Sequence, residues 1–217
     1  DILEALGVNI NMDREKIKKC LEEIGIAFLF APNLHPAMKH VMPARKQIGK
    51  KTMFNILGPL INPARATNQL IGVYSLEWTK PLAQVLYNLG TVHVLVVFGE
   101  DGLDEVTTTD KTFISEVNAG KSKDYEIAPE DYGFRRVILK DLLCADISDN
   151  TRIVMDVINA KPGCHRDIVL FNSGCAIYAA DRVRSIQEGI ELAKESLDSG
   201  KALEKLELLK EYSHAAG

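Results

Sequence analysis

The sequence predicts an α/β protein in which strands pair in parallel and helices cover the sheet. The first observation is an alternation of segments: strand-like residues over 69–74, a helical pattern over 79–89 and a valine-rich strand over 93–98. A strand, a helix and a second strand in succession are typical of a parallel βαβ unit. The second observation is the mainly helical spacing of the last third, from Asp167 onward. With 217 residues, 46% of them hydrophobic and 26% charged, the composition is that of a folded globular protein and excludes disordered and fibrous classes.

The first sixty residues are predicted to be mainly helical. Over 13–24 the apolar side chains recur with the three- and four-residue spacing of an amphipathic helix, and Gly25 ends the pattern. The apolar run 26–30 predicts a short buried strand. Two further helices are expected, over 36–49 with a kink or break at Pro43, and over 52–57 up to the pair Gly58-Pro59.

Strands and helices then alternate. Gly90 closes the predicted helix 79–89, and shorter strands are expected between 106 and 117, with turns at 110–111 and 118–120. The polar stretch 121–133 predicts a loop. Helices are expected over 185–197 and 201–212, on either side of Gly200.

Composition also limits the function. The net charge of −4 does not favour a general nucleic-acid binder or an anionic-membrane binder, both of which are normally basic. No apolar run reaches the roughly 18 residues of a membrane span, and the first residues do not resemble a secretory signal. The four cysteines show no metal-binding spacing, so we expect them to be reduced, as in a cytoplasmic protein.

Charge is distributed unevenly along the chain. Between Glu23 and Glu77 there are six basic residues and no acidic one, whereas 100–110 carries five acidic residues and no basic one. The acidic run follows the predicted strand 93–98, and ligands of open α/β sheets gather at the carboxyl ends of parallel strands. Carboxylates at such a place suit Mg²⁺. The alternative is that both segments are ordinary solvated surfaces.

Several catalytic motifs are missing. There is no Rossmann or Walker phosphate loop and no G-x-S-x-G elbow. The neighbouring Cys164 and His165 are interpreted as structural, because a nucleophile and its base must meet in space, which adjacency in sequence does not show.

Four separated segments, in order along the chain, resemble the anthranilate phosphoribosyltransferases. They are 28–39 (FLFAPNLHPAMK) with 43–45 (PAR), 52–63 (TMFNILGPLINP), 99–105 (GEDGLDE), and the tail around Asn172, Gly189 and 199–202 (SGKA). The resemblance spans essentially the whole chain. It implies a mostly parallel central sheet flanked by helices, with helices contributed to a smaller, here incomplete, helical domain. The α/β domain would comprise 1–31 and 66–217, and the helical segment 32–65.

The resemblance implies a transferase that moves the phosphoribosyl group from phosphoribosyl pyrophosphate to anthranilate in tryptophan biosynthesis, with Mg²⁺ as cofactor. Asp104 and Glu105 match the family's metal-binding acidic pair. Arg45 matches the arginine that binds anthranilate, and a guanidinium fork suits a planar carboxylate. Four further positions would line the acceptor pocket or its entrance, together with His35: Gly58, Pro59, Ala31 and Pro32. No acid or base is assigned, because the aniline nitrogen is already neutral at pH 7 and positioning can suffice.

One departure from the family concerns the donor. The family's glycine-rich pyrophosphate loop is expected upstream of the residue equivalent to Asp1, and none of the 15 glycines supplies it. We therefore expect this chain to correspond to the C-terminal two thirds of a cytoplasmic homodimer, and to be inactive by itself. Two alternatives stay open: a pyrimidine nucleoside phosphorylase-like enzyme and a non-catalytic, nucleic-acid-binding paralogue.

Overall fold

The computed structural model describes residues 1–34 and 57–215. Contacts divide these residues into two compact units. The first unit contains the described residues up to Gly58, Cys144–Asn159, and those from Leu197 onward; the second contains Pro59–Leu143 and Ala160–Ser196. The segment 32–65, predicted to belong to a helical domain, lies largely outside the described residues.

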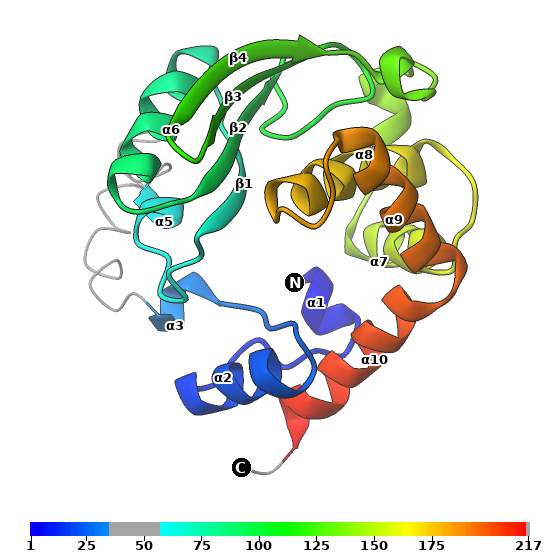
Figure 1. Ribbon diagram of the computed structural model, residues 1–217. Helices are drawn as coiled ribbons and strands as arrows, with labels where there is room; N and C mark the ends of the chain where they lie inside the picture. Colours follow the sequence, from blue (N-terminus) through cyan, green and yellow to red (C-terminus); the bar gives the residue numbers. More distant parts are fainter. Residues whose placement is uncertain (35–56, 216–217) are drawn as a thin grey trace, which may run out of the picture. The chain divides into compact units, whose positions relative to one another are not determined.

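A four-stranded sheet forms the centre of the second unit (Figure 1). Its strands lie in chain order: β1 (Asn68–Gly72), β2 (His93–Gly99), β3 (Thr112–Asn118) and β4 (Lys121–Ile127). β1 and β2 are parallel, whereas β2 with β3 and β3 with β4 are antiparallel. The α/β class is confirmed, but the sheet of the described residues is mixed, not mostly parallel. The reason is that no crossover helix follows β2: the loop 100–111 leads back into β3, and a two-residue turn joins β3 to β4.

Helices cover both faces of this sheet. α6 (Thr79–Asn88) connects β1 to β2, which confirms the predicted parallel unit, and α8 (Cys164–Ala179) lies on the other face. The side chains of β2 alternate between them, because successive residues of a strand point to opposite faces. Val94 and Val96 pack in the cluster that contains α6, and Leu95 and Val97 in the cluster that contains α8. A strand buried on both faces therefore shows the continuous apolar run seen in the sequence.

The remaining elements of this unit are short, apart from one helix whose last two residues belong to the first unit. They are α5 (Leu57–Leu60), the 3₁₀ helices η2 (Leu76–Trp78), η3 (Pro129–Tyr132) and η4 (Leu139–Leu142), and α9 (Ile186–Asp198). α8 and α9 approach each other through two glycines, since a Cβ on Gly189 would lie 2.3 Å from the carbonyl oxygen of Gly174. Only glycine permits such close helix packing.

The described part of the first unit is helical. It contains α1 (Ile2–Ala5), α2 (Arg14–Glu23), α3 (Ala31–Leu34), α7 (Ile147–Ile158) and α10 (Lys201–His214). The predicted helix 13–24 is confirmed as α2, whose first turn is capped by Asp13: the Lys16 N–H donates to Asp13 Oδ1 at 2.8 Å. The buried faces of α2 and α10 meet in one apolar cluster, in which Ile17, Cys20 and Leu206 are buried.

Three sequence predictions of secondary structure were wrong, the third being the strand expected before the turn at 110–111. The apolar run 26–30 is not a strand, because no neighbouring strand pairs with it among the described residues; its side chains pack on the helical core instead. The polar stretch 121–133 is not a loop but contains β4, an edge strand whose charged side chains face solvent. The helix α7 was not predicted. The expected strand over 69–74 is confirmed in shortened form, and 106–111 precedes β3 as a loop.

Among the described residues, every helix is too short or too polar to span a lipid bilayer. All four cysteines are free, as expected from their spacing.

Candidate functional site

The loop after β2 carries the acidic residues singled out by the sequence. It turns back at once: the Gly102 N–H donates to the Gly99 carbonyl (2.8 Å) and the Gly99 N–H to the Leu103 carbonyl (2.9 Å). Gly102 has a φ of +91°, a left-handed conformation that favours glycine. The loop thus leaves the sheet in a tight turn at the carboxyl end of the strand that is parallel to β1.

Asp101 is directed into this loop. Its carboxylate accepts from the Leu103 N–H (3.0 Å), from Thr107 Oγ1 (2.5 Å) and from Thr109 Oγ1. Because Asp101 has three donors of its own, it serves to hold the loop in shape. Sequence reasoning did not assign it a role, although two threonines that follow at a short distance were an available signal.

Asp104 and Glu105, by contrast, are exposed to solvent. Although Glu105 is exposed as a residue, its carboxyl group is partly shielded from water by the atoms around it. This shielding, together with the neighbouring charges of Asp104 and Asp101, raises the pKa of Glu105. Repulsion of this kind is relieved when a cation binds between carboxylates. Among the described residues no three His, Cys, Asp or Glu side chains gather closely enough to hold a metal by themselves. A pair of carboxylates nevertheless fits Mg²⁺, which keeps several waters and takes substrate oxygens as ligands.

Two distant parts of the chain fix the backbone on either side of this pair. A Cβ on Gly72, at the end of β1, would lie 1.5 Å from the carbonyl oxygen of Asp104, so the loop packs directly on the glycine backbone. On the other side, the Val106 N–H donates to Asn172 Oδ1 (2.9 Å), and Asn172 Nδ2 donates to the Val106 carbonyl (2.6 Å). Neither role was predicted, although Asn172 was noted as part of the family resemblance.

The described residues do not test the predicted acceptor pocket. Ala31 and Pro32 are exposed residues of α3, and Gly58 is an exposed residue of α5, to which Pro59 also belongs. His35 and Arg45 lie outside the described residues. The roles predicted for these six positions therefore stay predictions.

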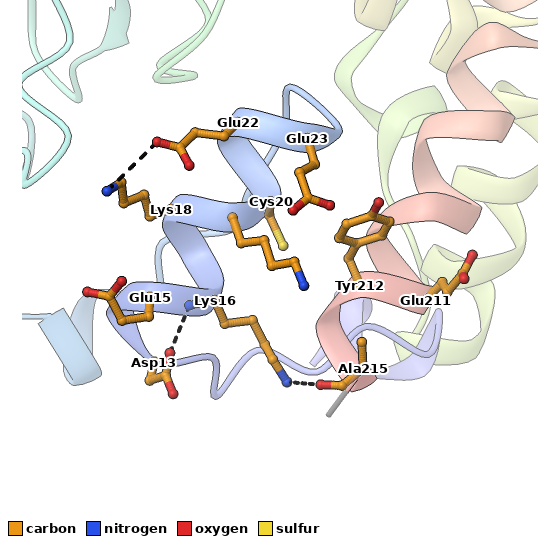
Figure 2. A pocket seen from close by; sticks show the side chains of 11 residues that line it. Asp13, Glu15, Lys16, Lys18, Cys20, Glu22, Glu23, Glu211, Tyr212 and Ala215 are labelled. Atoms are coloured by element: carbon orange, nitrogen blue, oxygen red, sulfur yellow. Dashed lines mark hydrogen bonds and ion pairs between the residues drawn. The ribbon is translucent and has the colours of Figure 1, made fainter. Parts of the chain in front are cut away.

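A groove lies elsewhere, between α2 and α10 of the first unit. Figure 2 shows this groove of about 530 Å³, which is lined mainly by charged side chains and has the sulfur of Cys20 at its floor. Several of these side chains already have partners: Lys16 Nζ donates to the Ala215 carbonyl (2.5 Å), and Lys18 pairs with Glu22 (3.9 Å). None of the predicted site residues lines it.

A buried ionisable cluster surrounds the beginning of β2, at the opposite end of the strand from the acidic loop. His93 is fully buried between two carboxylates, with Nδ1 2.7 Å from Asp181 Oδ1 and Nε2 3.2 Å from Glu116 Oε1. Glu116 also accepts from the hydroxyls of Tyr125 (2.7 Å) and Tyr178 (2.9 Å). Burial by itself would lower the pKa of His93, but the hydrogen bonds to Glu116 and Asp181 outweigh it and raise the pKa.

The described residues thus form an α/β protein with two exposed carboxylates on a loop that packs on β1 and is hydrogen-bonded to α8. Residues 1–203 match the family described as "Glycosyl transferase family, a/b domain", and the chain belongs to this family.

Individual members of the family that resemble this chain are anthranilate phosphoribosyltransferases. The chain is 47% identical over 214 residues to an anthranilate phosphoribosyltransferase of Symbiobacterium thermophilum, a match that covers 99% of this chain but 63% of the relative. The structure matches that of the enzyme named likewise from Thermus thermophilus, with a TM-score of 0.90, 38% identity and coverage of 99% and 64% of the two chains. It also matches Saccharomyces cerevisiae anthranilate phosphoribosyltransferase in complex with PRPP and Mg, with a TM-score of 0.89, 28% identity and coverage of 98% and 61%. The resemblance inferred from the motifs is therefore confirmed.

Proposed function

We propose that the whole protein transfers the phosphoribosyl group of phosphoribosyl pyrophosphate to anthranilate, with release of pyrophosphate. The observation that carries the proposal is the exposed pair Asp104–Glu105, on a loop anchored at the end of β2, in a chain that aligns over 99% of its length with anthranilate phosphoribosyltransferases. Because the chain spans about 63% of the length of such a relative, the activity is proposed for the whole protein.

On the donor side, Asp104 and Glu105 would hold Mg²⁺. The ion would neutralise the charge that develops on the departing pyrophosphate, which is the largest electrostatic requirement of the reaction. The yeast neighbour was solved with PRPP and Mg, which supports the assignment of both. The residues of this chain contribute by presenting two carboxylates from a fixed backbone, with Asp101 turned inward as a brace.

On the acceptor side, we assign the anthranilate carboxylate to Arg45, with His35, Gly58 and Pro59 lining the pocket and Ala31 and Pro32 near its entrance. A guanidinium binds a planar carboxylate through two parallel hydrogen bonds and thereby orients the ring. A further yeast structure contains 4-fluoroanthranilate, which supports an anthranilate-like acceptor. We assign no general base, since the neutral amine needs only to be positioned.

The proposal extends to the organisation of the protein. The segment 32–65 would belong to a small helical domain, and the rest of the chain to the α/β domain. The complete protein would be a cytoplasmic homodimer that does not act on nucleic acid.

The test is the loss of anthranilate fluorescence when the complete protein is mixed with phosphoribosyl pyrophosphate and Mg²⁺. We expect a loss that requires both donor and metal. In the same assay, Arg45→Ala should raise the KM for anthranilate by about tenfold or more, since a charge-assisted hydrogen bond contributes roughly 1.5–3 kcal/mol. The KM for the donor should change little.

The matched control is Arg182→Ala, which removes the same charge from an exposed residue near the cluster of His93. It should behave as the unmodified protein does. An unchanged anthranilate KM in Arg45→Ala would contradict the role of Arg45. Phosphorolysis of pyrimidine nucleosides without any use of anthranilate would replace the proposed function by the phosphorylase alternative.

A further inference from the structure

The loop that carries Asp104 and Glu105 places several like charges close together. Residues 100–105 contain four carboxylates and no basic side chain. Such a loop tends to open so that the charges separate, since like charges repel. A site for a divalent cation needs the opposite, namely carboxylates held near one another before the ion arrives. The residues that hold the loop closed therefore determine how well it binds a cation.

Asn172 is suited to this task because its amide side chain pairs with both polar backbone groups of one residue. It accepts from the Val106 N–H (2.9 Å) and donates to the Val106 carbonyl (2.6 Å), as an adjacent strand would. The same Nδ2 donates to the Ile168 carbonyl one turn earlier in α8 (3.0 Å), so the amide is itself oriented by its helix. Val106 is fully buried and directly follows Glu105.

The opposite side of the pair is fixed by backbone contact. The carbonyl of Asp104 lies directly against the backbone of Gly72. Because the two backbones already touch, the loop cannot move closer to β1. The backbone of Glu105 therefore lies between a packing contact of Asp104 with β1 and a hydrogen-bonded contact of Val106 with α8. We propose that Asn172 is a positioning residue for the cation-binding pair, acting through Val106 and not through contact with substrate. The inference rests on the proposed function of Asp104 and Glu105.

The experiment compares Asn172→Ala with two other variants of the complete protein, using Mn²⁺ as a paramagnetic probe for the Mg²⁺ site. Free Mn²⁺ is measured by electron paramagnetic resonance during titration. We expect Asn172→Ala to weaken Mn²⁺ binding by about tenfold or more, the range found when groups that orient metal ligands are removed. In turnover assays the Mg²⁺ concentration for half-maximal rate should rise by a similar factor, while the KM for anthranilate stays within about twofold.

The matched control is Asn68→Ala. Asn68 lies in the same unit, and its side-chain amide also donates to a backbone carbonyl, that of Ala179 at 2.8 Å. In the strand register Asn68 lies opposite His93, at the end of β2 that is far from the acidic loop. It should lower thermal stability about as much as Asn172→Ala and leave Mn²⁺ binding unchanged. Equal weakening of Mn²⁺ binding in both variants would reduce the role of Asn172 to general stability and overturn the proposal.

Asp104→Asn separates the two possible failures. If it abolishes Mn²⁺ binding while Asn172→Ala binds normally, the positioning role is refuted and the metal site stands. If Asp104→Asn binds Mn²⁺ as the unmodified protein does, the metal site itself is refuted, and the inference with it. A local readout accompanies these titrations: hydrogen exchange of the Val106 amide should be faster in Asn172→Ala, because that amide loses its acceptor.

Discussion

Replacement of His93 by Gln tests whether the buried cluster at the start of β2 stabilises the protein through a charged imidazole. His93 has no solvent exposure and lies between Glu116 and Asp181. Its pKa is raised above the usual 6.5 by these two partners, against the effect of burial. A glutamine of similar size can keep one hydrogen bond but carries no proton that titrates. The variant therefore removes the part of the pH dependence that comes from His93 and leaves much of the packing in place.

The sign and size of the effect follow from proton linkage. Because the pKa of His93 is higher in the folded protein, the native state holds more protons than the unfolded state from about pH 6.5 upward. The stability from His93 is complete below that pH and is lost as the pH rises through the folded pKa. Within this window the free energy of unfolding should fall by up to about 1.4 kcal/mol per pH unit.

Glu116 shapes the acidic side of the same profile. Burial alone would raise the pKa of Glu116, but hydrogen bonds from His93, Tyr125 and Tyr178 lower it overall. Its contribution is therefore complete above the usual carboxyl pKa and is lost as the pH falls through the depressed value. The cluster should stabilise the protein most between about pH 4.5 and 6.5.

Urea denaturation between about pH 5 and 9 measures these differences, since this range brackets the usual histidine pKa. The signal is the fluorescence of Trp78, the only tryptophan of the chain, which is partly buried and packs against the core on the α6 face of the sheet. His93→Gln should flatten the decline above about pH 6.5. Parallel profiles for His93→Gln and the unmodified protein would refute the assignment of a raised pKa.

Two further substitutions test the packing and capping inferred above. Gly189→Ala should destabilise the protein by roughly 1–3 kcal/mol in thermal unfolding, because its Cβ would lie 2.3 Å from the Gly174 carbonyl oxygen and force α8 and α9 apart; an unchanged Tm would show that the helices do not meet there. Asp13→Ala should cost about 1 kcal/mol in urea denaturation, since the N-cap bond to the Lys16 N–H is lost, whereas Asp13→Asn should retain most of it. Equal losses for Ala and Asn would contradict the capping role.

The sequence predicted the parts of the fold whose signals are local. β2 is buried on both faces, so its apolar run was visible, and α2 has both a regular apolar spacing and a terminating glycine. β4 was missed because six of its seven residues are polar or aromatic and it pairs on one edge only. The turn before it was predicted, and Ala119 and Gly120 both have positive φ there, the geometry of a two-residue hairpin turn. The turn alone would have supported a second strand.

The mixed sheet shows what local sequence signals cannot predict, namely the direction of strands that are not joined by a helix. One strand–helix–strand unit was extended to a mostly parallel sheet, but the direction of β3 depends on the path of the chain after β2. Residues 100–111 return the chain through the acidic loop and enter β3 antiparallel, so the loop proposed to bind the cation is also the connection that reverses the sheet.

The proposed cation-binding residues could be predicted from local sequence, whereas the residues that position them could not. Asp104 and Glu105 could be proposed from a short motif, because two neighbouring carboxylates after a predicted strand already indicate a cation site. Gly72 and Asn172 could not, since they come from β1 and α8, the latter 66 residues away from Val106. Neither residue supplies a functional group for the ligand. Gly72 contributes by having no side chain, and Asn172 by hydrogen-bonding both backbone groups of Val106. Features of that kind become visible only when folding brings the segments together, and a loop of repelling carboxylates is the place where they matter most.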